Sequence, residues 1–258
     1  MIYDCFCFHK EIEVLDIRFN ILSPYVDKFI VIEAKYTHAN QPRPLFFQEN
    51  KLDEKYGDKI IHIVVDSFDG HHLSEHGRYA YEYEQRDYID KWLKGNAVDD
   101  DVILVSDVDE IPNPKLFFVT DFSQPVICEQ NLYIYYLNAI TTQLWLGTGA
   151  CRYRDYRGAN WLKRFYKKWQ HIQNCGWHFS FIGGVDRVVN KIESYSEQQV
   201  NNDTIKNSIA SKIKNLQDPF DTSVDGKYRT LSVCDIKTLP IYIQENIEQY
   251  RGLLYGDF

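Results

Sequence analysis

The stretch DDDVILVSDVDEIPNP, residues 99–114, constrains the fold most, because it surrounds a short apolar run with carboxylates. Residues 102–106 are aliphatic at four of five positions, which predicts a strand buried on both faces. In an extended chain, alternation directs Asp107 and Asp109 to the same side. Two prolines downstream stop the strand from continuing. The motif fits turn or capping carboxylates, or paired oxygen ligands for a divalent cation.

Strand and helix signals alternate before this motif at a spacing typical of βαβ units. The patterns predict strands at 2–8, 28–34 and 59–66, helices at 11–22 and about 74–93, and a short polar helix near 48–56. This order predicts an α/β fold with a mostly parallel, Rossmann-like sheet flanked by helices. The motif then lies at the carboxyl edge of the fourth strand, where open α/β sheets bind ligands.

The second half of the chain is less regular and richer in aromatic residues. It predicts one long or two consecutive strands at 126–140, a loop-rich stretch at 145–161, a strand at 175–181, a helix from 183 and a terminal helix at 239–256. Because no repeat, low-complexity tract or linker interrupts the chain, we expect residues 1–258 to form one compact domain.

Composition excludes several classes of protein. The net charge of −8 argues against nucleic acid as a partner. There is no apolar run of roughly 18 residues and no signal peptide pattern at the start, so a soluble, cytoplasmic protein without a membrane anchor is expected. The six cysteines lack paired C-x-x-C spacing, which favours free thiols.

The chain has neither of the common glycine-rich phosphate-binding motifs, G-x-G-x-x-G and G-x-x-x-x-G-K-[ST]. A divalent cation held by the aspartates would replace the backbone N–H groups of such a loop, because it neutralises phosphate oxygens directly. This chemistry is typical of nucleotide-sugar transfer.

Several segments occur in an order known from one enzyme family. They are YDCFCFHKEIEVLDIRFNIL, VDKFIVIEAKYTHANQPRPLFF, YEQRDYI, DDDVILVSDVDEIPNP, GWHFSF with a following KIESYS, and LPIYIQEN. The chain resembles family seventeen glycosyltransferases, the family of the bisecting N-acetylglucosaminyltransferases, over nearly its whole length. The combination of D-x-D-E-I-P and G-W-H carries most of the specificity.

The resemblance implies a GT-A fold, an inverting mechanism, Mn²⁺ or Mg²⁺ as cofactor, a UDP-sugar donor carrying N-acetylglucosamine and a glycan or glycoconjugate acceptor. It makes residues 1–111 the nucleotide-sugar-binding half and 112–258 the acceptor-binding half with the C-terminal helices. Eukaryotic members carry an N-terminal membrane anchor, whereas this chain begins at the first strand. We therefore expect a bacterial or viral type of enzyme that builds a surface glycan from cytosolic nucleotide sugars.

The resemblance also assigns the metal site. Asp109 is the expected metal ligand, and Asp107 contacts the donor ribose or the metal. His178, in G-W-H, is expected to bind the metal or the diphosphate, or to be a core histidine.

Further residues are expected to bind the donor. Glu33 and Asp66 follow strands and are candidates for uracil or ribose, with capping as the alternative. Arg86 is a candidate for uracil or diphosphate, or for an i,i+4 pair with Glu82 or Asp90. Lys191 is a candidate for neutralising the leaving UDP, or it lies on a solvated helix face.

Inversion requires a general base that takes the acceptor proton. The candidates are Asp155, Asp186 and Glu110, of which Asp155 ranks first because GT-A enzymes often carry the base in such a segment. Asp186 is alternatively a helix cap, and Glu110 a turn cap or salt-bridge partner. Trp145 and Trp177 are expected to stack on acceptor sugars, or to be core residues.

Two other interpretations remain open. A metal-dependent nucleotidyltransferase would use the same aspartates and release pyrophosphate, and a non-catalytic glycan-binding module would bind sugar without UDP or metal. A separate zinc-like spacing, His72 and His76, lacks an adjacent third ligand, so a polar loop entering a helix is preferred there.

Overall fold

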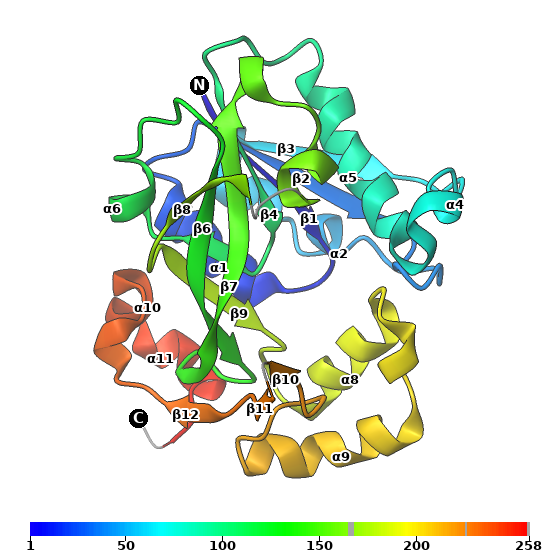
Figure 1. Ribbon diagram of the computed structural model, residues 1–258, viewed down its shortest axis with the longest axis vertical. Helices are drawn as coiled ribbons and strands as arrows, with labels where there is room; N and C mark the ends of the chain where they lie inside the picture. Colours follow the sequence, from blue (N-terminus) through cyan, green and yellow to red (C-terminus); the bar gives the residue numbers. More distant parts are fainter. Residues whose placement is uncertain (165–167, 225, 257–258) are drawn as a thin grey trace.

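A computed structural model describes residues 1–164, 168–224 and 226–256 of the chain. Its centre is a ten-stranded sheet in which eight strands follow the order β3-β2-β1-β4-β7-β6-β9-β5, while β8 pairs with β6 and β12 pairs with β7 (Figure 1). Four strands run parallel: β1 (Ile2–Phe8), β2 (Lys28–Ala34), β3 (Ile60–Val65) and β4 (Val102–Asp107). The predicted α/β fold is confirmed, with a mixed sheet whose first half is entirely parallel.

The remaining strands extend this sheet through the second half of the chain. β7 (Ala139–Arg152) runs antiparallel to both β4 and β6 (Val126–Ile134), and β6 is parallel to β9 (Gly176–Ser180). Shorter strands are β5 (Glu110–Pro112), β8 (Gln170–Ile172) and β12 (Leu231–Val233), with a separate hairpin of β10 (Ser223–Val224) and β11 (Lys227–Tyr228).

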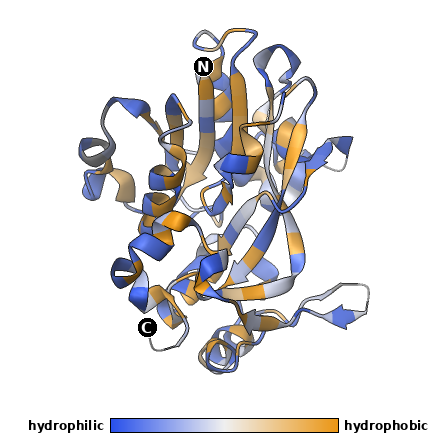
Figure 2. Ribbon diagram, turned by 90° about the vertical axis from the view of Figure 1, so that its left-hand side faces the viewer, coloured by the Kyte–Doolittle hydropathy of each residue, from blue (hydrophilic) through white to orange (hydrophobic). Residues whose placement is uncertain are grey.

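Helices cover both faces of the parallel strands. Because successive side chains of a strand point to opposite faces, neighbouring residues of β1 belong to different cores. Phe6 and Phe8 pack in the same core as α1 (Ile12–Leu22), α10 (Ile241–Glu245) and α11 (Ile247–Tyr250). Cys5 packs in the core that includes α5 (Ala80–Leu93) and α7 (Ala159–Arg164). Figure 2 shows the central strands as largely hydrophobic. Each fully buried aliphatic or aromatic side chain contributes about 1.5–3 kcal/mol.

The other helices are short or lie at the far end of the sheet. They are α2 (Phe46–Glu49), α3 (Leu52–Tyr56), α4 (Leu73–His76), α6 (Pro114–Phe117), α8 (Val185–Ser194) and α9 (Asp203–Lys214). The last two pack on Leu132 and Ile134 of β6. Throughout the described ranges, every helix is too short or too polar to cross a membrane.

Two predicted helices are interrupted in the structure. The helix expected from about 74 is broken after α4, which ends at His76, because its C-cap Gly77 has a φ of 50°, which is unfavourable for most residues, and α5 begins at Ala80. The region 126–140 holds two consecutive strands, which is one of the two predicted alternatives, with Tyr135 at φ 71° directly after β6. The terminal helix is divided at Asn246 into α10 and α11, followed by a 3₁₀ turn at Arg251–Leu253.

Of the stretch 145–161, predicted as loop-rich, residues 145–152 belong to β7, and the rest forms a 3₁₀ turn, a short loop and the start of α7. Gly149 pairs on both sides, with Val105 of β4 and with Ile127 of β6. At Gly149 an added Cβ would lie 3.1 Å from Leu162 Cγ of α7. The glycine therefore lets α7 approach the sheet closely, which a propensity argument does not detect.

Candidate active site

A pocket of about 820 Å³ opens at the carboxyl edge of β4. Six residues nominated from the sequence line it, namely Arg86, Asp107, Asp109, Trp145, His178 and Lys191. They come from α5, the end of β4 and the turn after it, β7, β9 and α8. The pocket therefore combines both halves of the chain at the sheet edge that the strand order predicts.

A buried arginine shapes the turn that carries the two aspartates. Arg18 of α1 donates to the carbonyl oxygens of Asp107, Val108 and Glu110 at 3.1, 3.2 and 2.9 Å. It is fully buried and paired with Asp4 of β1 at 2.5 and 2.8 Å. The chain turns after Asp107 instead of staying extended, so the expected alternation of the two carboxylates does not apply.

Asp109 faces the second half of the chain. It is 4% exposed, with Lys191 Nζ 2.8 Å from Oδ2 and His178 Nε2 3.4 Å from Oδ1. Burial acts to raise the pKa of this carboxyl, but Lys191 and His178 outweigh burial and hold the pKa well below its usual range. β5 pairs with β9 so that Glu110 lies opposite His178, and this register brings the histidine beside the motif.

Asp107 faces α5 and α7, which carry its two cationic partners. Arg86 lies 3.1 Å from Oδ1 and Lys163 of α7 lies 3.4 Å from Oδ2. Burial opposes ionisation, yet these two cations lower the pKa of the carboxyl. Arg86 also pairs with Glu82 at 2.5 Å, so the i,i+4 pair and the contact with the motif exist together.

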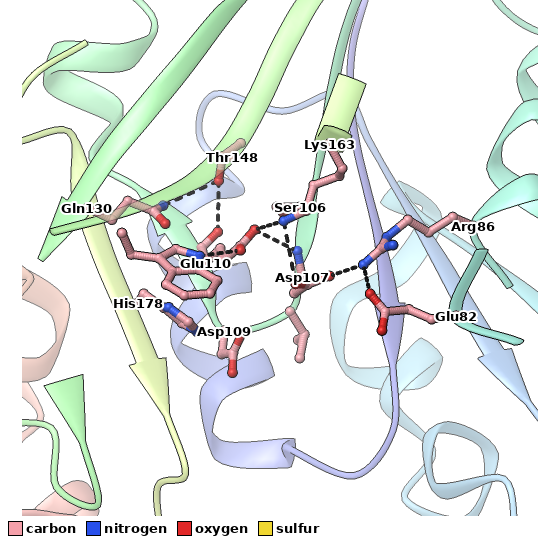
Figure 3. A network of polar contacts seen from close by, with 12 residues as sticks. Glu82, Arg86, Ser106, Asp107, Asp109, Glu110, Gln130, Thr148, Lys163 and His178 are labelled. Atoms are coloured by element: carbon pink, nitrogen blue, oxygen red, sulfur yellow. Dashed lines mark hydrogen bonds and ion pairs between the residues drawn. The ribbon is translucent and has the colours of Figure 1, made fainter. Parts of the chain in front are cut away.

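Glu110 lies behind the pocket wall, where it connects several site residues (Figure 3). It is 0% exposed, and Lys163 Nζ lies 2.6 Å from Oε2. The same oxygen accepts from the Asp107 backbone N–H at 2.9 Å, while Oε1 accepts from Trp145 Nε1 at 2.7 Å. Trp145 in turn lines the pocket, with its ring 4.7 Å from that of His178.

Asp109 and His178 are compatible with a shared divalent cation. Adjacent ligands of an octahedral ion at about 2.1 Å are about 3.0 Å apart, close to the 3.4 Å between Asp109 Oδ1 and His178 Nε2. His178 Nδ1 is buried without a hydrogen-bond partner in the part of the chain that the structure describes. Within the same ranges, no cluster of three metal-ligating side chains includes Asp107 or Asp109, so further ligands would have to come from the donor or from water.

Other nominated donor and acceptor residues lie outside this lining. Glu33 is fully buried and contacts the Phe47 backbone N–H and His62 Nε2, the latter at 3.0 Å. Asp66 is exposed and pairs with Lys35 at 2.5 Å, at the rim of a smaller pocket. Trp177 packs against the α1 core and donates to the Thr238 carbonyl at 3.2 Å.

Two of the three nominated bases lie away from the pocket. Asp155 follows β7, whose end at Arg152 pairs with Val102 at the start of β4. It is therefore at the opposite edge of the sheet from Asp107. Asp186 is exposed in the first turn of α8 and is not among the described lining residues. Glu110 is the nominated carboxylate that contacts the motif.

Sequence reasoning missed two cations of the site, Lys163 and Arg18. Lys163 lies 53 residues from Glu110 in sequence, in a region expected to be irregular, so no pattern connected the two. Arg18 interrupts the apolar stripe of α1, and a charged residue within such a stripe was the available signal.

Comparison with known proteins matches the whole chain, residues 1–258, to the model of glycosyltransferase family 17. The chain is 33% identical over 114 residues to the beta-1,4-mannosyl-glycoprotein 4-beta-N-acetylglucosaminyltransferase of Homo sapiens, and equally so to that of Rattus norvegicus. Each match covers 40% of this chain and 20% of the relative, so the chain spans about a fifth of these relatives' length. On the full-length family match, the chain belongs to glycosyltransferase family 17.

Proposed function

We propose that this protein transfers N-acetylglucosamine from UDP-N-acetylglucosamine to a glycan or glycoconjugate acceptor, with inversion to a β-linkage and with Mn²⁺ or Mg²⁺ as cofactor. The observation that carries the proposal is the Asp109 and His178 pair, 3.4 Å apart in the pocket of a family 17 chain. The named activity of the two relatives supports the choice of sugar.

In this proposal Asp109 and His178 hold the cation, which when bound neutralises diphosphate charge. Lys191 and Arg86 border the same pocket and supply fixed positive charge for the leaving UDP. Asp109, His178, Lys191 and Arg86 together bind and orient the donor. Trp145 is 38% exposed and presents its ring to the pocket, which suits stacking on an acceptor sugar.

Glu110 is the general base of the proposal, because it is the nominated carboxylate that contacts the site. It is hydrogen-bonded to Trp145, which separates it from the pocket. Displacement of this indole by an acceptor would uncover Oε1 for the acceptor hydroxyl. The base then takes one proton while the acceptor oxygen displaces UDP from the anomeric carbon in a single step.

Comparison of two variants tests the base. Glu110→Gln should lower kcat by at least about 10²-fold, within the range of general-base effects, and leave UDP affinity within about threefold. Asp155→Asn is the matched control and should keep kcat, since Asp155 lies at the far edge of the sheet. Loss of kcat in Asp155→Asn with a normal Glu110→Gln enzyme would reverse the assignment.

A donor panel tests the reaction itself. UDP release from UDP-N-acetylglucosamine with an acceptor glycan, abolished by EDTA and restored by Mn²⁺, is the expected result. Pyrophosphate release would indicate a nucleotidyltransferase, and sugar binding indifferent to UDP and Mn²⁺ would indicate a glycan-binding module. An α-linked product by NMR would exclude single displacement.

A further inference from the structure

A second group of metal-ligating side chains lies where the loop after β3 packs on α5. His71 Nε2 and His72 Nε2 lie 3.1 and 2.8 Å from the same oxygen of Asp87, Oδ2. The three ligand atoms are within 4.8 Å of one another. The loop and helix expected around His72 are present, and the third ligand that is missing nearby in sequence comes from α5.

The hydrogen bonds around this group orient it for a cation. Asp69 Oδ1 lies 2.5 Å from His71 Nδ1, and Asn160 Nδ2 donates to Asp87 Oδ1 at 2.9 Å. A neutral imidazole that donates from Nδ1 carries a lone pair at Nε2, and here that lone pair would face a carboxylate oxygen. A cation between Nε2 and Oδ2 would satisfy both atoms when Nδ1 is the donor. A carboxylate on the outer nitrogen is also the usual companion of a metal-binding histidine.

A buried carboxylate adds negative charge beneath the group. Glu84 is 3% exposed, and its Oε1 has no hydrogen-bond partner among the residues that the structure describes. Its Oε2 accepts from the Asp69 N–H at 2.8 Å and lies 4.0 Å from His71 Nδ1. An unpartnered buried oxygen is costly, and a nearby cation would reduce that cost.

We propose that His71 Nε2, His72 Nε2 and Asp87 Oδ2 bind a transition-metal ion of the Zn²⁺ class, at a site separate from the donor pocket. Two imidazoles with one carboxylate favour Zn²⁺ over Mg²⁺ or Ca²⁺. Tetrahedral ligand atoms at 2.0–2.2 Å from zinc are about 3.4 Å apart, so the side chains must separate by a few tenths of an ångström. His71 is half exposed and has room to move.

The bound ion would have a structural role. It would fix the loop after β3 to α5 at the residue next to Arg86, which contacts Asp107. Through Asn160 the same aspartate is connected to α7, which carries Lys163. The site would therefore steady the two helices that supply cations to Asp107.

Zinc titration of the full chain, without a polyhistidine tag and after EDTA treatment, tests this proposal. We expect one Zn²⁺ per chain by mass spectrometry of the metal and by competition with a chromophoric chelator. His72→Asn and Asp87→Asn should each weaken binding at least about 100-fold. Circular dichroism checks that these variants fold, and Co²⁺ absorption reports tetrahedral geometry in the parent chain.

Three controls locate the ion. His171→Asn removes another surface imidazole, which pairs with Glu129 at 2.8 Å, and should leave zinc affinity unchanged. His76→Asn tests an alternative group formed with His72 and Glu75, and Asp109→Asn tests the donor pocket. Loss of zinc in either of the last two variants, or no stoichiometric zinc in the parent chain, would overturn the proposal.

Discussion

Arg18 connects the stability of the fold to the shape of the site. It is fully buried, pairs with Asp4 and donates to three carbonyl oxygens of the turn. Removing one member of a buried ion pair leaves the other charge uncompensated, at about 3–5 kcal/mol. Arg18→Met should therefore lower the free energy of unfolding by about that amount, measured by urea denaturation.

The double variant Arg18→Met/Asp4→Asn separates the two roles of Arg18. It should regain part of the lost stability, because no unpaired charge remains buried. It should not regain affinity for UDP, because the carbonyl groups of the turn still lack their donor. Full UDP affinity in the refolded double variant would show that Arg18 only balances the charge of Asp4.

The residues of the site differ in how far the sequence predicted them. Asp107, Asp109 and His178 belong to contiguous motifs, and the structure brings all three to one pocket. Lys163 has no motif, because its place depends on β7 and α7 folding back onto β4. Asp155 was nominated by its position along the chain, and the antiparallel direction of β7 carries it to the other edge of the sheet.

At the scale of elements, β5 is three residues long but sets the position of the active site, since its pairing with β9 places Glu110 opposite His178. Gly176 permits this pairing. An added Cβ there would lie 2.2 Å from the Ile111 carbonyl oxygen, and φ is 143°. Gly176→Ala should therefore destabilise the fold by about 2 kcal/mol or more and lower catalytic activity.

Gly252→Ala is the matched control for this variant. Among the residues that the structure describes, nothing lies within 4 Å of a Cβ added at Gly252, so the unfolding free energy of this variant should stay within about 0.5 kcal/mol of the parent chain. Urea denaturation of both variants gives the comparison. Equal stability of the two alanine variants would mean that β5 and β9 adjust to the added methyl group.

The elements predicted best are those with local signals. The strands at 2–8 and 28–34 coincide with β1 and β2, because their apolar runs and flanking turns are encoded within each segment. β5, β8 and β12 are too short to show a period and exist through partners distant in sequence. β7 was missed over its glycine-containing half, where pairing on both sides overrides propensity.

At the scale of the molecule, the pocket draws its lining from Cys7 near the start of the chain to Arg229 near the end. A ligand bound there contacts elements of both halves and stabilises the chain as a unit. The lining also contains opposed charges, Asp107 and Asp109 against Arg86 and Lys191. A nucleoside diphosphate with a divalent cation supplies complementary charges of both signs, so the two should bind together.

Thermal unfolding with UDP and Mn²⁺ tests this coupling. A ligand at about 100 times its Kd stabilises the folded state by about 2.7 kcal/mol, and about 2–4 °C per kcal/mol is expected for a chain of this size. UDP with Mn²⁺ should therefore raise Tm by about 5–10 °C, and either component alone by much less. Asp109→Asn should lose the Mn²⁺-dependent part of the shift, whereas Asp155→Asn should keep it. A GDP shift equal to that of UDP would contradict the proposed donor, and a full UDP shift in EDTA would show that Lys191 and Arg86 bind the diphosphate without a metal.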